Sequence, residues 1–103
     1  MKPLFAVIRV RGAAWDQSRP LEGQPAWPAH AAFMNGLKAE GFVVLGGPLE
    51  GTSEVLLIVR AENDAEVRSR LAADPWSAND LLRVARTAPW TLRLGSLEED
   101  NTR

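Results

Sequence analysis

Hydrophobic and polar positions change their spacing along the chain, and each change predicts a new secondary-structure element. Residues 4–10 (LFAVIRV) are a short run of branched and aromatic side chains, which is typical of a strand. From Pro28 the apolar positions recur at helical spacing, and Gly41 provides a stop, so we expect a helix between the two. The runs FVVLGG (42–47) and SEVLLIVR (53–60) predict further strands, and the turn residues of GPLEGT predict a hairpin loop between them.

The second half of the chain predicts another helix and another strand. Asn63, with Glu66 three residues later, resembles a capping box and predicts the start of a helix. DPWSANDLL (74–82) predicts a short helical turn, and the last strand is expected within LLRVARTAPWTLRLG (81–95), with Pro89 restricted to an edge or a bulge. The order strand, helix, strand, strand, helix, strand predicts an α+β fold of the ferredoxin-like βαββαβ type. In that fold, both helices cover one face of a four-stranded antiparallel sheet.

The predicted strands are apolar on both faces. A sheet with one face in water alternates apolar and polar residues. Residues 4–8 and 55–59 are instead apolar throughout. Each large apolar side chain left in water would cost roughly 1.5–3 kcal/mol. We therefore expect a second copy of the chain to cover the open face, sheet against sheet, in a homodimer.

Composition narrows the number of domains and the possible partners. The 103 residues suit one domain, which we assign to residues 1–97, followed by a polar tail at 98–103. A net charge of -1 lacks the basic excess of nucleic-acid-binding domains, so no nucleic acid is expected as a partner. The apolar run at the N-terminus is interrupted by Arg9 and is too short for a signal peptide or a membrane span. The sequence thus predicts a soluble, cytoplasmic protein with no membrane partner.

Residues 12–25 (GAAWDQSRPLEGQP) form a long connection that carries two glycines, two prolines and mixed charge without a clear period. A connection of this length is uncommon in a small domain and often forms a lid or a binding loop. It is equally compatible with a mobile surface loop, so the sequence leaves its role open.

His30 is the only histidine, and it falls on the apolar stripe near the start of the first predicted helix. As a general base it would benefit from the helix N-terminus, whose partial positive charge disfavours the imidazolium. The other interpretation is a half-buried histidine that donates one hydrogen bond to a backbone carbonyl. One histidine, no cysteine and scattered carboxylates make a poor transition-metal site, so we expect no metal.

Asp74 precedes Pro75 in the stretch ADPW, and this position also has two interpretations. Aspartate is a favoured helix N-cap and proline a favoured next residue, so a cap alone explains the pair. A cap is also a rigid way to aim a carboxylate at a reactive site. The two roles do not exclude each other.

The four tryptophans divide into two groups. Trp27 and Trp76 lie close in the sequence to His30 and Asp74, so they are candidates for the walls of an apolar pocket. Trp15 and Trp90 are expected in the core or at an interface, where large aromatic side chains are most often found.

His30 within WPAHAAFMNGLKAEGFVVLGGPLEG, then ADPW after the second helix, then a closing APW form an ordered set. This set resembles the YCII-related family over nearly the whole chain, from the first strand to residues 89–90. The resemblance implies a dimeric α+β barrel, in which two ferredoxin-like units pack their sheets face to face. It also implies that His30 and Asp74 are the catalytic residues of a pocket. The residues that we expect to bind substrate are Trp27, Gly47, Pro48 and Trp76.

The resemblance further implies a cofactor-free lyase or isomerase that uses His30 as a general base. Asp74 would accept a hydrogen bond from one ring nitrogen, fix the tautomer and stabilise the imidazolium. The substrate would be a small organic molecule such as a lactone, a phenol or a halogenated ring. Family members often carry an arginine shortly before the histidine, and QPAWPAH has none, which favours a flat apolar ligand unless Arg9 or Arg86 supplies charge. The alternative function is a non-catalytic dimeric module that binds a small molecule or a partner domain.

Overall fold

Strands and helices alternate along the chain in the order that the sequence predicts, and the computed structural model describes residues 2–97. The elements are β1 (Leu4–Arg11), η1 (Leu21–Gly23), α1 (Trp27–Ala39), β2 (Val43–Pro48), β3 (Glu54–Arg60), α2 (Asp64–Ala72), α3 (Pro75–Ala78) and β4 (Leu82–Trp90). The predicted polar tail at 98–103 lies outside the described residues. Among residues 2–97, no helix has the length and apolar character needed to cross a membrane.

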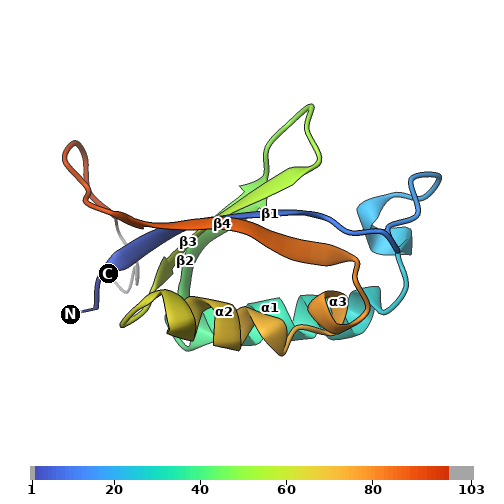
Figure 1. The fold of residues 1–103 in the computed structure, drawn as a ribbon, viewed down its shortest axis with the longest axis horizontal. Coiled ribbons are helices and arrows are strands. Elements are labelled where there is room, and N and C mark those ends of the chain that lie inside the picture. Colours follow the sequence, from blue (N-terminus) through green and yellow to red (C-terminus); the bar gives the residue numbers. More distant parts are fainter. Residues whose placement is uncertain (1, 98–103) are drawn as a thin grey trace.

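The strands form one antiparallel sheet in the order β2-β3-β1-β4. Figure 1 shows α1, α2 and α3 together on one side of this sheet. This is the ferredoxin-like βαββαβ arrangement, so the predicted α+β fold is confirmed. β4 lies at one edge of the sheet, where Pro89, which has no N–H to donate, is tolerated.

The core lies between the sheet and the helices. Phe5 and Val7 of β1 pair with Val59 and Leu57 of β3, and all four are buried. They form one cluster with Leu37, Phe42, Val43, Ala61, Val67 and Leu71. Arg9 occupies the next position in the helix-facing row of β1 and is also buried. A charged side chain therefore enters the layer between sheet and helices at one end of the core.

The opposite face of the sheet carries Ala6, Ile8, Leu56 and Ile58, which alternate with the core residues along β1 and β3. None of the described helices covers this face (Figure 1). Ala6, Ile8 and Leu56 are only half-buried in the single chain. The face is therefore both apolar and open.

Side chains at the helix starts explain where α2 and α3 begin. Asn63 Oδ1 accepts a hydrogen bond from Glu66 N at 2.9 Å, as expected for an N-cap. The Glu66 carboxylate, however, accepts from Glu62 N at 2.7 Å. The predicted capping box, which requires the N–H of Asn63, therefore forms only in part. Asp74 caps α3, and Trp76 N is the donor at 2.9 Å.

One buried side chain holds the 12–25 connection together. Gln24 is 3% exposed, accepts a hydrogen bond from Asp16 N at 2.9 Å, and donates to Asp16 O at 2.7 Å and Arg19 O at 3.1 Å. η1 lies within the same stretch and contacts α1. The connection is therefore a loop with its own internal hydrogen bonds, placed against the helix that carries His30.

Candidate active site

A hydrogen bond joins His30 to Asp74, which is 44 positions away in the sequence. His30 Nδ1 lies 2.9 Å from both Oδ1 and Oδ2 of Asp74. The first turn of α1 supplies the histidine and the N-cap of α3 supplies the aspartate, so both side chains come from helix ends. His30 is 8% exposed and Asp74 is fully buried. The interpretation of His30 as a donor to a backbone carbonyl is wrong, because its ring partner is a carboxylate.

Asp74 caps α3 and is also bonded to the side chains of Arg9 and His30. Oδ1 accepts from Trp76 N at 2.9 Å, which caps α3, while Oδ2 accepts from Arg9 Nη1 at 2.9 Å. Burial by itself would raise the pKa of Asp74, but the hydrogen bonds from His30, Trp76 N and Arg9 outweigh it and lower that pKa below its usual value. Asp74 is therefore an ionised acceptor. It follows that His30 Nδ1 carries the proton in their hydrogen bond.

The other ring nitrogen of His30, Nε2, has no hydrogen-bond partner among residues 2–97. In the same part of the chain, Arg9 Nε is the only buried side-chain polar atom without a partner, so His30 Nε2 reaches accessible space. Because Nδ1 donates to Asp74, a neutral imidazole keeps its lone pair on Nε2. This nitrogen is the one that can accept a proton.

Aromatic side chains fix the plane of the imidazole. The rings of His30 and Trp76 stack with centroids 3.8 Å apart and planes 4° from parallel. Trp76 is fully buried, and its Nε1–H donates to Pro25 O at 2.7 Å. Trp27 lies 5.9 Å from His30 between ring centroids. Trp15, which was expected in the core or at an interface, packs its edge against Trp76 and belongs to the same cluster.

Arg9 enters the site from β1, with 1% of its surface exposed. Besides the bond to Asp74, its Nη2 donates to Ser77 Oγ at 2.8 Å, and Ser77 Oγ donates in turn to Leu71 O at 2.8 Å. Burial lowers the pKa of Arg9, against the opposing effect of the Asp74 carboxylate. An arginine nevertheless remains charged in proteins, so the guanidinium is a permanent cation beside Asp74.

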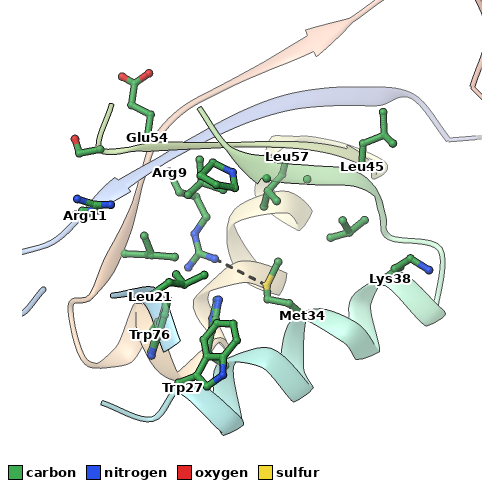
Figure 2. A pocket seen from close by; sticks show the side chains of 18 of the residues that line it. Arg9, Arg11, Leu21, Trp27, Met34, Lys38, Leu45, Glu54, Leu57 and Trp76 are labelled. Atoms are coloured by element: carbon green, nitrogen blue, oxygen red, sulfur yellow. Dashed lines mark hydrogen bonds between the residues drawn. The ribbon is translucent and has the colours of Figure 1, made fainter. Parts of the chain in front are cut away.

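A cavity of about 570 Å³ opens beside His30, between α1 and strands β2 and β3 (Figure 2). The four residues predicted to bind substrate all line it: Trp27, Gly47, Pro48 and Trp76. Asp74 is not part of the lining, so it reaches the cavity only through His30 and Arg9. The 12–25 loop contributes Trp15 and Leu21, which assigns that loop to the wall of the cavity.

The charged residues of the lining are mainly cationic. The lining contains three cationic side chains, Arg9, Arg11 and Lys38, and one carboxylate, that of Glu54. Arg86, the other source of charge considered from the sequence, is exposed on β4 and is absent from the lining. The cavity therefore offers positive charge without an arginine directly before the histidine.

Sequence reasoning missed Lys38 although a signal was present. His30, Met34 and Lys38 follow one another at a spacing of four, which winds them along one side of α1 toward the same space. Arg11 carried a signal of another kind: it lies two positions after Arg9 in β1, which puts both side chains on one face of the strand, and both line the cavity. Within residues 2–97, no three side chains of His, Asp or Glu come together as ligands for a metal ion.

Comparison with known proteins places this architecture in a family. The YCII-related domain matches residues 12–91, which is more than half of the chain. The chain belongs to the YCII-related family. The matched segment of this YCII-related protein contains His30, Asp74 and the GGP motif, and it begins after Arg9. No curated protein matches the chain significantly.

One solved structure similar to this YCII-related protein is 5-chloro-2-hydroxyhydroquinone dehydrochlorinase from Burkholderia phenoliruptrix AC1100, in complex with 2,5-dihydroxybenzoquinone. The two share 28% sequence identity at a TM-score of 0.56, over 89% of this chain and 95% of that chain. The likeness agrees with the ferredoxin-like fold described above. It also connects the fold with a chain named for dehydrochlorination and bound to a small quinoid ring.

Proposed function

We propose that this YCII-related protein is a cofactor-free enzyme in which His30 acts as general base on a small phenolic or halogenated ring, in an elimination or an isomerisation. The observation that carries the proposal is the orientation of the imidazole: Nδ1 is committed to Asp74, and Nε2 is free beside a cavity. A general base needs a lone pair at a fixed position within reach of its substrate. Asp74 and the stacked ring of Trp76 hold that lone pair in place.

In the elimination, His30 Nε2 takes a proton from a hydroxyl or an acidic C–H group of the ring. The electron pair of that bond moves into the ring, and the imidazolium delivers the proton to the ring carbon that bears the halogen. His30 Nε2 then takes a proton from a second hydroxyl, whose electron pair forms a carbonyl while the halide leaves with the electron pair of its C–X bond. The imidazolium then returns its proton to water, so the net change is the loss of HX without any external oxidant or reductant. Return of the proton to another ring carbon gives an isomerisation instead. Asp74 stays ionised throughout and stabilises the imidazolium.

The walls and the charge of the cavity favour a flat, acidic ring. Trp15 and Trp27 offer aromatic surface on which such a ring can stack, and the fully buried Trp76 packs against both of them. Arg11 and Lys38 offer cationic groups for phenolate or quinone oxygens. The similar dehydrochlorinase binds 2,5-dihydroxybenzoquinone, a flat ring with acidic hydroxyl groups, which supports this substrate class.

Chloride release from 5-chloro-2-hydroxyhydroquinone and other chlorinated hydroquinones tests the proposal. Purified protein without added metal or cofactor is expected to produce chloride and quinone in equal amounts. The assay is run without oxygen, because hydroquinones oxidise in air and would form quinone without releasing chloride. A parallel set of small lactones tests for isomerisation. Tight binding of these rings without turnover would identify the alternative, a non-catalytic module that binds small molecules.

The ligand class predicts a fluorescence signal. Three of the four tryptophans, Trp15, Trp27 and Trp76, line the cavity, so 2,5-dihydroxybenzoquinone is expected to quench most of the tryptophan emission. Trp27→Ala should weaken binding roughly tenfold, because it removes one aromatic wall. Trp90→Phe is the matched control and should leave the affinity unchanged, since Trp90 lies outside the lining. An affinity that falls only in the Trp90 variant would place the ligand elsewhere.

We further propose that two copies of the chain pair through the open face of the sheet. Ala6, Ile8 and Leu56 are half-buried on this face, and their removal from water would stabilise the pair. A second sheet offers a surface of matching shape and chemistry. A cytoplasmic location and a domain extending over residues 1–97 stay predictions from the sequence.

Light scattering is expected to give a mass about twice that of the 11.3 kDa chain. Ile8→Asp should produce a monomer, because it would place a charge without a partner inside an apolar interface. Leu94→Asp is the matched control: Leu94 is 88% exposed and lies outside the sheet, so this variant should remain a dimer. A wild-type monomer at high protein concentration contradicts the proposed pairing.

A further inference from the structure

We propose that Arg9 is a positioning residue of this site: it holds Asp74 in place and balances its charge, so that His30 remains a neutral imidazole able to accept a proton. The inference rests on the proposed function of His30 as general base. Arg9 acts on that base through Asp74, to which both side chains are bonded. It lies outside the segment that matches the family domain.

The position of Arg9 in β1 directs its side chain into the site. It follows Phe5 and Val7 in the helix-facing row, and the pairing of β1 with β4 shifts register between Ile8 and Arg9. Irregularities of this kind in a sheet re-aim a side chain, often beside a functional site. In Figure 2 the guanidinium extends from the sheet into the space above α1. Nη1 reaches Asp74 and Nη2 reaches Ser77, so both ends of the guanidinium are held.

One carboxylate is shared by two nitrogen groups. Asp74 Oδ2 lies 2.9 Å from Arg9 Nη1 and 2.9 Å from His30 Nδ1, so the two nitrogens are within about 6 Å of each other. The remaining charged groups around the cavity are Arg11, Lys38 and Glu54. The permanent charge of Arg9 already cancels that of Asp74. A proton added to His30 would leave an unbalanced positive charge in a buried site, which favours the neutral imidazole.

Packing alone does not account for an arginine at this position. Its Nε is buried without an acceptor among residues 2–97, and an unsatisfied buried donor destabilises the folded protein. Burial of the charge adds a desolvation cost that ion pairing offsets only in part. Phe5 and Val7 occupy the same helix-facing row of β1 and bury neither an unsatisfied donor nor a charge. The arginine is therefore explained by what it does to Asp74 and His30.

The single histidine makes a direct test possible by NMR of protein labelled with nitrogen-15 histidine. The wild type at pH 7 is expected to show a neutral ring with its proton on Nδ1. In Arg9→Met the imidazolium would replace the guanidinium as partner of Asp74, so the charged form of the ring should be the main signal at pH 7. Arg9→Lys keeps the charge and should show the neutral ring of the wild type. Arg83→Met, which removes an arginine from the exposed pair with Asp80, is the matched control and should also show the neutral ring.

A charged ring in the wild type at pH 7 would overturn the inference, as would a folded Arg9→Met whose ring is neutral at that pH. If Arg9→Met does not fold, the wild-type spectrum and Arg9→Lys decide instead. A charged ring in Arg9→Lys at pH 7 would show that the charge of Arg9 is not what matters. None of these measurements uses a substrate. If the spectra are as expected but no chloride is released, the proposed reaction is refuted and the role of Arg9 stands. If chloride is released but the spectra differ from those expected, the reaction stands and the role of Arg9 is refuted.

Discussion

His30→Asn is expected to lower kcat/KM for chloride release from 5-chloro-2-hydroxyhydroquinone by roughly 10²–10⁴-fold, which is the usual contribution of a positioned general base. The asparagine amide can still donate a hydrogen bond to Asp74 from nearly the position of Nδ1, so Asp74 and Arg9 keep their partners. The variant lacks only a nitrogen with a lone pair at the position of Nε2. Initial rates over a range of substrate concentrations measure the effect.

A binding measurement separates the loss of the base from the loss of the site. In the fluorescence titration with 2,5-dihydroxybenzoquinone, His30→Asn should bind within a few-fold of the wild type, because the tryptophans that line the cavity are unchanged. Turnover equal to that of the wild type would remove His30 from the mechanism. Loss of both binding and turnover would mean that His30 is needed to form the binding cavity, and its role as a base would lose its support.

Asp74→Asn is expected to destabilise the folded protein by about 3–5 kcal/mol, the effect typical of removing one partner from a buried ion pair. Asp74 is fully buried and accepts hydrogen bonds from His30, Arg9 and Trp76 N. An amide has a single oxygen and adds an NH₂ group, so at least one of these donors would face another donor. Arg9 would also remain as a buried charge without its counterion. Urea denaturation at one fixed protein concentration measures the difference.

Asp80→Asn is the matched control for this substitution. Asp80 is also bonded to an arginine, Arg83, but their pair is exposed to solvent. Exposed ion pairs contribute little to stability, so the change should be far smaller than in Asp74→Asn. Equal losses in the two variants would mean that burial of the pair between Asp74 and Arg9 is not the cause.

The stability difference between the wild type and Asp74→Asn should also depend on pH. Burial by itself would raise the folded-state pKa of Asp74. The hydrogen bonds from His30, Trp76 N and Arg9 outweigh this effect and lower that pKa below its unfolded value. Such a group contributes its full stability above the unfolded pKa of about 3.9 and loses it as the pH falls through the lower folded value. The difference should therefore be fully present above about pH 5 and shrink below about pH 4. A difference that grows on acidification contradicts this assignment.

The order of the elements was predictable because it depends on interactions over a few residues. The apolar run at 4–10 and the run at 53–60 each became a strand, and Gly41, with a φ of 84°, follows α1 as the predicted stop. The capping of α2 shows the limit of such reasoning. Glu66 had the spacing of a capping box, but its carboxylate turned to Glu62 N, because the path of the chain before the helix decides which N–H is in reach.

Prediction of the candidate site was less complete. His30 and Asp74 stood out as chemical types, and the resemblance to the YCII-related family placed them in one pocket. Neither spacing nor composition distinguished a cap from a hydrogen-bond partner at Asp74, and the structure contains both. Arg9 drew attention only as a possible source of charge, although it contacts Asp74 directly.

Residue order alone was enough to establish the α+β class, the apolar character of both sheet faces, and the few side chains able to carry chemistry. The meeting of Arg9, His30 and Asp74 became visible only in three dimensions, because 44 and 65 positions separate Asp74 from its two partners. Local preferences act within a helix or a turn. The contacts that build this site depend instead on how α1 and α3 pack against each other and against the sheet, and that packing is a property of the whole fold.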